Sequence, residues 1–203
     1  MSDDRERWNE TYRTDEEFEL PDDPIPALQS RIETLPAGRA LDVATGTGRN
    51  ALFLAETGYD VDAVDVSDAA LERAERAGEA RGVDVNWIRS DIADFAFEES
   101  AYDVIAVSFF AALDRLPDIK EALAPGGVLV YEHHLRSSDP IDMGPSTDRY
   151  RFRANDLLRA CLDLTILDYR ERTRTDDEGR TLAVATLVGR NSTGGRQSYP
   201  PEE

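Results

Sequence analysis

The stretch ALDVATGTGRNALFLAETGYDVDAVDVS, residues 40–67, decides the fold. It predicts an apolar strand, a tight glycine-containing turn, an amphipathic helix over 49–56, and a second strand that ends in Asp65. Gly46 and Gly48 allow the backbone to turn sharply and leave room for a ligand. The first N–H groups of the helix point back at that ligand, and an acid at the end of the next strand is placed to bind the hydroxyls of a ribose. This layout predicts a site for an adenosine-containing cofactor.

The turn departs from the dinucleotide-binding fingerprint Gly-x-Gly-x-x-Gly. It reads Asp42-x-Ala44-x-Gly46-x-Gly48, and Asn50 follows where a third glycine is expected. An acid followed by alternating small residues resembles motif I of the class I S-adenosylmethionine-dependent methyltransferases, in which the first small position is usually glycine. The resemblance implies that the turn contacts the methionine half and the ribose of the cofactor. The alternative is a buried turn whose glycines serve geometry alone.

Further segments follow in the order of that family. NWIRSDIADF, residues 86–95, is a predicted strand that runs into Asp91 and Ile92, and the resemblance implies that these two residues contact the adenine. YDVIAVSFFAA, residues 102–112, reads as a buried strand because of its apolar run. LAPGGVLV, residues 123–130, resembles the loop and fifth strand of the family.

The motif and the resemblance together predict one set of cofactor contacts and no metal site. The set is Tyr12, Arg13, Asp42, Ala44, Gly46, Gly48, Asn50, Asp65, Val66, Ser67, Asp91, Ile92, Ser108 and Phe109. Tyr12 and Arg13 either close over the methionine part of S-adenosylmethionine, with Arg13 pairing with its carboxylate, or belong to a solvated N-terminal arm. The resemblance covers about residues 8–190.

Three segments resemble the tellurite-resistance and thiopurine-type branch of these methyltransferases. WNETYR, residues 8–13, resembles its Trp-x-x-x-Tyr opening segment, and TGTGRNALFL, residues 45–54, resembles its Cys-Gly-Thr-Gly-Arg-Asn helix start with Thr45 in place of the cysteine. RANDL, residues 153–157, resembles its Arg-Pro-Gly-Glu-Leu segment. The sequence EHH at 132–134 departs from the usual Glu-Thr-Phe. The resemblance implies a small acceptor such as a thiol or a chalcogen oxyanion.

The charge of the chain is extreme. Forty-two acids face 23 bases in 203 residues, for a net charge of −19, and Lys120 is the single lysine. Such an acidic surface is typical of a protein from a high-salt cytosol, a halophilic composition, because carboxylates keep a chain hydrated when salt screens other interactions. An ordinary acidic enzyme is the alternative. The length suits one domain with a single core.

Composition also bears on partners and location. Nucleic acid is a poor partner, because binding phosphates needs a basic stripe, and Arg149, Arg151 and Arg153 form the one local basic cluster. Cys161 stands alone among apolar neighbours, which favours a small core residue over a nucleophile. No run approaches the roughly 18 apolar residues of a membrane span, and the charged N-terminus is unlike a signal peptide. We expect a cytoplasmic protein with no membrane partner.

The apolar runs and turn residues predict an α/β fold. The resemblance implies a Rossmann-like, seven-stranded methyltransferase sheet, mostly parallel with a reversed terminal hairpin, and helices on both faces. The predicted strands cover about 40–44, 60–65, 84–89, 102–107, 127–133, 163–171 and 181–188. The predicted helices cover about 26–35, 49–57, 68–81 and 154–162, with another that begins near Pro117.

The chain is expected to divide into three parts. The first is a charged N-terminal arm or lid over 1–26, with Trp8, Tyr12 and Phe18 as anchors. The second is an S-adenosylmethionine-binding domain over 27–190. The third, over 191–203, is a polar tail that is expected to be disordered.

Methyl transfer from a sulfonium needs alignment of the two reactants, and a base only where the acceptor must lose a proton. His133 and His134 are the two histidines of the chain, and because successive strand residues face opposite sides, at most one faces the site. That histidine is predicted to be a base or an acceptor-orienting group; the alternative is one surface and one packed histidine. Arg153 either attracts an anionic acceptor or pairs with the surrounding acids.

Three functions follow from these features. The first is S-adenosylmethionine-dependent methyl transfer to a small-molecule acceptor. The second is an NAD(P)-binding Rossmann oxidoreductase, although 203 residues leave no room for the catalytic domain that such enzymes add. The third is a non-catalytic S-adenosylmethionine-binding protein.

Overall fold

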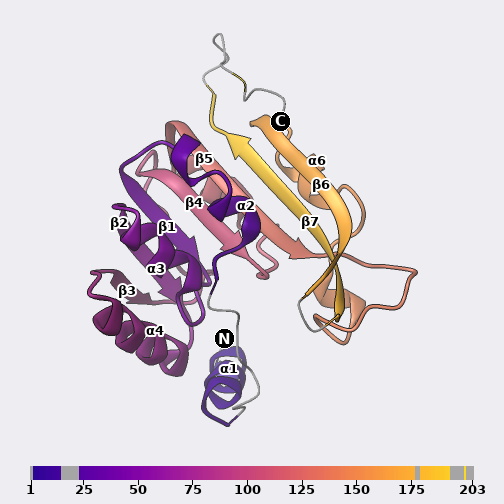
Figure 1. The fold of residues 1–203 in the computed structure, drawn as a ribbon, viewed down its shortest axis with the longest axis horizontal. Coiled ribbons are helices and arrows are strands. Elements are labelled where there is room, and N and C mark those ends of the chain that lie inside the picture. The colour runs from indigo at the N-terminus through magenta and orange to yellow at the C-terminus, as the bar shows by residue number, and fades with distance from the viewer. Residues whose placement is uncertain (1, 15–22, 177–178, 193–198, 200–203) are drawn as a thin grey trace.

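A twisted seven-stranded sheet forms the centre of the molecule (Figure 1). The computed structural model describes residues 2–14, 23–176, 179–192 and 199. Its strands are β1 (Arg39–Val43), β2 (Asp60–Asp65), β3 (Asn86–Arg89), β4 (Tyr102–Ser108), β5 (Leu123–His134), β6 (Thr165–Thr175) and β7 (Thr181–Arg190). Its α-helices are α1 (Ser2–Thr14), α2 (Pro26–Gln29), α3 (Arg49–Glu56), α4 (Asp68–Arg81), α5 (Leu116–Glu121) and α6 (Asp156–Ala160), and the 3₁₀ helices are η1 (Ile32–Thr34) and η2 (Asp148–Tyr150).

The strand order is β3-β2-β1-β4-β5-β7-β6. The first five strands of this order pair in parallel, whereas β7 is antiparallel to both β5 and β6. The predicted Rossmann-like sheet with a reversed terminal hairpin is therefore confirmed. The order reverses between β1 and β4, and open α/β sheets bind their ligands outside the carboxyl ends of the strands at such a point.

Helices cover both faces of the sheet, and strand alternation decides which side chains meet them. On one face, Leu28 of α2 and Leu54 of α3 are fully buried against the strands, in a cluster that includes Val104 and Val130. On the other face, α5 and α6 bury apolar side chains in the larger core; these are Leu116, Ile119 and Leu157. The cores are apolar, so chemistry is confined to the strand ends.

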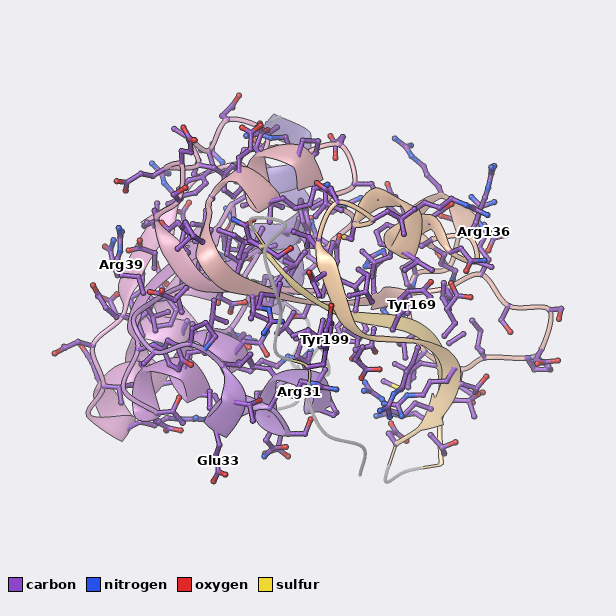
Figure 2. The ribbon with its side chains drawn as sticks, turned by 90° about the horizontal axis from the view of Figure 1, so that it is seen from above. Arg31, Glu33, Arg39, Arg136, Tyr169 and Tyr199 are labelled. Atoms are coloured by element: carbon purple, nitrogen blue, oxygen red, sulfur yellow. The ribbon has the colours of Figure 1, made fainter. Side chains whose placement is uncertain are left out.

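The carboxyl ends of the parallel strands gather at one end of the molecule. In Figure 1, α1 lies beyond that end, and the segment after β5 leaves from it. Arg39 begins β1 at the opposite, amino end, whereas Arg136 follows the carboxyl end of β5; the two are labelled on opposite sides of Figure 2. The segment after β5 is fixed to the start of β7, because the N–H groups of Asp142 and Met143 donate to the carbonyl of Thr181.

The local elements largely follow the sequence. The ranges of β2 and α4 are as predicted, and Ser67 caps α4 by accepting a hydrogen bond from the N–H of Ala70. Cys161 is fully buried in the core, as expected. Burial raises the pKa of its thiol to about 12, as befits an unreactive core residue.

One prediction about the N-terminal region is wrong. The helix expected over 26–35 breaks into α2 and η1, since the Thr34 hydroxyl bonds back to the carbonyl of Arg31 and Leu35 must be extended before Pro36. The first part of the expected charged arm or lid is the helix α1. Trp8 and Tyr12, four residues apart, lie on one side of it with ring centroids 6.1 Å apart.

Some expectations fall on residues that the structure does not describe. Phe18, the third expected anchor of the arm, lies outside the described residues, as does most of the tail predicted over 191–203. Among the described residues, no helix combines the length and the apolar character needed to cross a membrane.

Candidate functional site

Five polar side chains project from the carboxyl ends of four neighbouring strands onto the face covered by α2 and α3. We call them the carboxyl-end cluster: Asp42, Asp65, Ser108, Glu132 and His134. Strand register places them on one face, since Asp42 pairs with Ala63 and Ala106, two residues before Asp65 and Ser108, and Ser108 pairs with Glu132. The sheet thus brings acids, a hydroxyl and an imidazole together at the point where ligands bind in such folds.

The turn after β1 has an unusual backbone. Ala44, Gly46 and Gly48 have φ angles of 55°, 57° and 84°, all in the left-handed region. Glycine adopts this region freely, but alanine does so at a cost of about 1 kcal/mol or more. Ala44 therefore stands strained at the position where the family usually has glycine, and strain held in place by its surroundings is common at ligand sites.

Asp42 fastens this turn to α3. Its carboxylate is fully buried and accepts hydrogen bonds from the Thr45 hydroxyl (2.5 Å), the Ala51 N–H (3.2 Å) and the Asn50 amide (3.4 Å). Burial raises its pKa to about 6, although these bonds and the nearby Arg49 work in the opposite direction. The contacts of Asp42 are internal, so the structure places it behind the turn as a support.

Packing requires a glycine at position 48, as does the positive φ angle there. A Cβ on Gly48 would lie 2.8 Å from Cη2 of Trp87 and 3.0 Å from Cβ of Ala74. The sequence suggested that a ligand needs this space, whereas the structure fills it with the Trp87 ring. Contacts of Gly48 with a cofactor can therefore come only from its backbone.

Asp65 ends β2 beside the turn. Its two carboxylate oxygens accept the N–H groups of Gly46 (2.8 Å) and Ser67 (2.9 Å), and the residue is 7% exposed. Burial raises its pKa, and the backbone N–H groups of Ser67, Gly46 and Val66 oppose that shift. A carboxylate has about four acceptor positions, so Asp65 keeps acceptor capacity that fits the hydroxyls of a ribose.

Helix α1 docks beside Asp65. The Asn9 side-chain oxygen accepts hydrogen bonds from the Ser67 hydroxyl (2.8 Å) and the Ala69 N–H (3.2 Å), so it acts as a second cap for α4. Tyr12 packs on Ala69 with 7% exposure, and burial together with the Asp65 charge raises its pKa. The structure thus brings Tyr12 to the site, whereas its neighbour Arg13 is exposed. Sequence reasoning missed Asn9, although it lies in the WNETYR segment.

The residues expected at the adenine lie beyond β3. Asp91 is partly exposed, and its carboxylate accepts the Ala93 N–H at 2.9 Å. Ile92 is 3% exposed and belongs to the core under α5, and Val66 is partly exposed after β2. Asp91 and Val66 are therefore open to a ligand as the structure stands.

Asn50 and Ser108 join the turn to β4. The Asn50 amide donates to the Ser108 hydroxyl at 3.1 Å, and its oxygen accepts the Ile25 N–H at 3.0 Å. Phe109 follows Ser108 with a φ of 54°, a strained conformation for an aromatic residue. Its backbone N–H donates to the Glu132 carbonyl at 2.8 Å, which holds the main chain of Phe109 at the end of β4.

The two histidines face opposite sides of β5, as predicted. His133 is 1% exposed, and its ring lies 4.2 Å from that of Phe152. Its Nε2 is 3.0 Å from the Tyr150 carbonyl, which can only accept, so Nε2 carries the proton. His134 is partly exposed on the side of the carboxyl-end cluster, with its ring 4.5 Å from that of Phe109.

Burial lowers the pKa of both imidazoles, to about 4 for His133 and about 3 for His134, and the nearby Arg151 lowers both further. Both rings are therefore neutral at pH 7. The Nδ1 atoms of both are buried and have no hydrogen-bond partner among the described residues. His134 is thus a neutral imidazole at the mouth of the cluster, and His133 is packed behind it.

The arginine beside the histidines is Arg151 rather than Arg153. The Arg151 guanidinium donates to the carbonyls of Pro145, Leu135 and Met143 and so holds the segment after β5. Arg153 is exposed, and its backbone N–H donates to the Asp156 carboxylate at 2.9 Å.

Three charged residues of this region were missed from the sequence. Arg174 of β6 forms a two-point ion pair with the buried Glu132, and Arg49 of α3 lies with its Cζ 5.4 Å from the Phe109 ring centroid. An acid inside the apolar run of β5 could have identified Glu132. Arg174 falls between the strands predicted over 163–171 and 181–188, because nothing local marks it as part of a long strand.

No three His, Cys, Asp or Glu side chains in the described parts of the chain group as a metal site requires. The arrangement instead suits a polar, adenosine-containing ligand. Asp65 supplies acceptors, the strained turn supplies backbone groups, and α1 covers one side.

Comparisons with known proteins agree with this geometry. Residues 40–127 match the family described as a methyltransferase domain. The demethylmenaquinone methyltransferase of Thermus thermophilus is 37% identical over 111 residues, which are 51% of this chain and 50% of that protein. The probable S-adenosyl-L-methionine-dependent methyltransferase TehB of Haemophilus influenzae is 27% identical over 165 residues, 75% of this chain and 57% of that protein. The chain thus spans about half the length of these curated relatives.

Solved structures share the fold. The crystal structure of TehB from Haemophilus influenzae superposes with a TM-score of 0.68 and 20% sequence identity, covering 91% of this chain and 67% of that one. At this identity the likeness concerns the fold. With the domain match, the sheet order and the geometry of the turn, it shows that this chain is similar to S-adenosylmethionine-dependent methyltransferases and carries a methyltransferase domain over residues 40–127.

Proposed function

We propose that this protein transfers the methyl group of S-adenosylmethionine to a small-molecule acceptor. The observation that carries the proposal is the carboxyl-end cluster around the strained turn from Ala44 to Gly48. On the side of β2 it places the Asp65 carboxylate, which has free hydrogen-bond acceptor positions. On the side of β4 and β5 it places Ser108, Phe109 and His134, where the methyl acceptor would bind. The site thus has a nucleoside side and an acceptor side.

The residues that would hold the cofactor fit its parts. Asp65 would bind the ribose hydroxyls, Asp91 would lie near the adenine amino group, and the backbone between Ala44 and Gly48 would contact the remainder. Tyr12 would cover this side, since α1 is held there by Asn9. When bound, the cofactor supplies a methyl group that its sulfonium sulfur has already activated for displacement.

On the acceptor side, this chain would orient the acceptor and exclude water. Phe109 supplies an apolar wall, and the imidazole of His134 is neutral at pH 7 and would orient the acceptor by accepting a hydrogen bond from it. Arg153 is proposed as an anion anchor at the rim. An apolar wall, one titratable group and one cation favour a small acceptor, thiol-like or anionic, such as a chalcogen oxyanion.

The relatives bear on the acceptor in only one case. One relative is a demethylmenaquinone methyltransferase, which offers demethylmenaquinone as an alternative acceptor to compare. The other, TehB, matches three-quarters of this chain, and its name states no acceptor. The partly exposed His134 beside a single aromatic wall, Phe109, favours the small acceptor.

The deciding experiment measures binding first and turnover second. Calorimetry with S-adenosylhomocysteine and NAD should show binding of the first only; the reverse would favour the oxidoreductase. An acceptor panel of thiols, selenite, tellurite, amines and demethylmenaquinone analogues, in molar KCl, should release S-adenosylhomocysteine with a thiol or chalcogen compound. Binding without turnover over the whole panel would instead indicate a non-catalytic S-adenosylmethionine-binding protein.

A further inference from the structure

The segment after β5, residues 136–151, forms a loop that closes beside His134. At its base, the N–H of Phe152 donates to the His134 carbonyl at 2.9 Å, so the chain returns to the strand at the point where it left. At its far side, the N–H and the hydroxyl of Thr181 donate to the Asp142 carboxylate at 2.8 and 2.9 Å. The segment is therefore anchored to both β5 and β7.

Arg151 holds the middle of this segment. Its guanidinium donates two hydrogen bonds to the Pro145 carbonyl, at 2.7 and 3.0 Å, and one each to the carbonyls of Met143 and Leu135, both at 3.3 Å. Hydrogen bonds from a charged donor are stronger than those between neutral groups. Met143 and Pro145 are the two neighbours of Gly144, so Arg151 fixes the main chain on both sides of that glycine.

The main chain of Gly144 lies directly against the His134 imidazole. A Cβ on Gly144 would lie 2.7 Å from Nδ1, 2.8 Å from Cε1 and 3.1 Å from Cγ of that ring. The φ of Gly144 is 101°, in the region that favours glycine. Nδ1 of His134 is buried on this side without a hydrogen-bond partner among the described residues, so Nε2 is the ring nitrogen that a ligand can reach.

Two neighbours thus limit the space at His134. One is the Phe109 ring, whose centroid lies 4.5 Å from that of the imidazole, and the other is the main chain of Gly144. A side chain can change its rotamer to admit a larger ligand. A main chain that is held at both of its neighbours cannot move in this way, so the Gly144 side sets the limit.

We propose that Arg151 is a positioning residue that holds Gly144 against His134 and thereby limits the methyl acceptor to a small molecule, an inference that rests on the proposed function. Arg151 acts through the segment after β5 and does not itself touch the acceptor. An aliphatic thiol or a chalcogen oxyanion is small enough to reach Nε2 of His134. An aromatic ring of the size of a phenyl or a quinone is excluded as long as Gly144 stays in place.

The first experiment counts the groups that diethyl pyrocarbonate adds to His134, and it needs neither cofactor nor acceptor. The reagent carbethoxylates accessible nitrogens of neutral imidazoles, and tandem mass spectrometry assigns each added group to a residue. With excess reagent, the native protein should gain one group on His134, because Nδ1 lies under Gly144, and none on His133, which is 1% exposed. Arg151→Met should gain a second group on His134, because the released segment opens locally.

Arg149→Met is the matched control for this experiment. It replaces an exposed arginine of the same segment and should give the same count as the native protein. A second group on His134 of the native protein would show that Gly144 does not cover Nδ1. A single group on His134 of Arg151→Met would show that Arg151 does not hold Gly144 there. Either result overturns the proposal.

The second experiment measures the size limit with two thiols, 2-mercaptoethanol and thiophenol. The intrinsic reactivity of each thiol towards S-adenosylmethionine is the same for every variant, so a change in the ratio of their kcat/KM values reports on the space at His134. Arg151→Met should raise the ratio for thiophenol over 2-mercaptoethanol about 10-fold, chiefly through a lower KM for thiophenol. Its affinity for S-adenosylhomocysteine should stay native, which shows that the variant is folded. Arg149→Met should keep the native ratio.

The outcomes separate this inference from the proposed function. An unchanged ratio in Arg151→Met would overturn the size limit. A native protein that binds S-adenosylhomocysteine and methylates neither thiol would refute the thiol acceptor, and the size limit with it. A native protein that does not bind S-adenosylhomocysteine would refute the proposed function itself, whereas the carbethoxylation counts would still decide whether Arg151 holds Gly144 against His134.

Discussion

The Arg174 guanidinium on β6 holds the Glu132 carboxylate on β5 at two points, with N–O distances of 3.0 and 3.2 Å. Glu132 is fully buried, and the Thr186 hydroxyl on β7 donates a third hydrogen bond to it at 3.0 Å. The ion pair spans β7, which lies between the two strands. It thereby ties the reversed hairpin to the strand that ends in His134.

Replacing Arg174 should therefore destabilise the fold strongly. Arg174→Met leaves a buried carboxylate without its charge partner, and the loss should be about 3 kcal/mol, the lower end for buried pairs, because Arg174 itself is partly exposed. Urea denaturation at fixed KCl measures this loss. The control is Arg170→Met on the same strand, whose pair with Asp168 is half exposed and should contribute less than about 1 kcal/mol. Equal losses in the two variants would contradict the role of the Glu132 pair.

Asp65→Ala should weaken the binding of S-adenosylhomocysteine by about 1.5–3 kcal/mol, the scale of hydrogen bonds to a charged group. The reason is that the variant lacks the carboxylate proposed to accept hydrogen bonds from the ribose hydroxyls. Because Asp65 also accepts the Gly46 and Ser67 N–H groups, the variant should melt at a lower temperature as well. The control is Asp62→Ala on the same strand, which removes bonds to Arg39 and Tyr102 away from the site. It should lower the melting temperature and leave calorimetric affinity unchanged; unchanged affinity in Asp65→Ala would falsify the ribose assignment.

Local signals explain which elements could be predicted. The strand β2 and the helix α4 have apolar patterns and a clear Ser67 cap, all within a few residues. The turn from Ala44 to Gly48 was recognisable because a positive φ selects small residues. Such features depend on neighbours in the chain, which a sequence displays.

Long-range contacts explain what could not be predicted. Helix α1 is held in place by the hydrogen bond between Asn9 and Ser67, which are 58 residues apart. The charged composition of the N-terminal segment, taken alone, favours a solvated arm. Arg174 reaches Glu132 across 42 residues and an intervening strand. Gly48 faces Trp87, so its role in packing depends on a contact between distant segments. Partners of this kind are set by the folded sheet.

The buried histidines should make the protein sensitive to acid. The pKa of His133 is about 4 in the folded state, against an ordinary value of 6.5. Between these values the unfolded chain binds a proton that the folded protein excludes, so stability is complete above pH 6.5 and is lost as the pH falls towards 4. His134, with a pKa of about 3, acts in the same direction. Asp42 and Asp65 act in the opposite one, since burial raises the pKa of both carboxyl groups, to about 6 for Asp42.

His133→Phe should relieve part of this sensitivity, since a phenyl ring keeps the packing against Phe152 and cannot be protonated. The difference in unfolding free energy between pH 7.5 and pH 4.5 should shrink by about 2–3 kcal/mol relative to the native protein. Urea denaturation at both pH values measures it. An unchanged difference would show that His133 does not remain neutral in the folded state.

Salt should stabilise the protein. A net charge of −19 repels itself in dilute buffer, and salt screens that repulsion over about 10 Å at 0.1 M and about 3 Å at 1 M. Thermal melting should rise steeply from low to molar KCl, and NaCl of the same ionic strength should act alike if screening is the cause. A melting temperature that stays flat or falls over this range would rule out the halophilic interpretation of the composition.

His134 and His133 should differ in catalysis, because β5 sends them to opposite faces. His134→Ala removes the imidazole beside Phe109 and should lower kcat about 100-fold, because the acceptor loses a group that orients it. His133→Ala removes a buried ring behind the site; it should lower stability and keep kcat. Since the pKa of His134 is about 3, kcat should not fall through protonation of this group between pH 8 and pH 5. Steady-state kinetics in molar KCl with the acceptor found by the panel measure both variants.

Arg153→Ala completes this comparison on the acceptor side. Arg153 is exposed at the rim, so its loss should raise the acceptor KM and leave the affinity for S-adenosylhomocysteine unchanged. Arg159→Ala, which replaces another exposed arginine in the last turn of α6, is the matched control and should change neither constant. If both histidine variants keep full kcat and Arg153→Ala changes neither constant, the proposed acceptor side is wrong. Catalysis would then rest on alignment of the two reactants alone, and the acceptor-orienting groups would have to come from α1 or from the segment after β5.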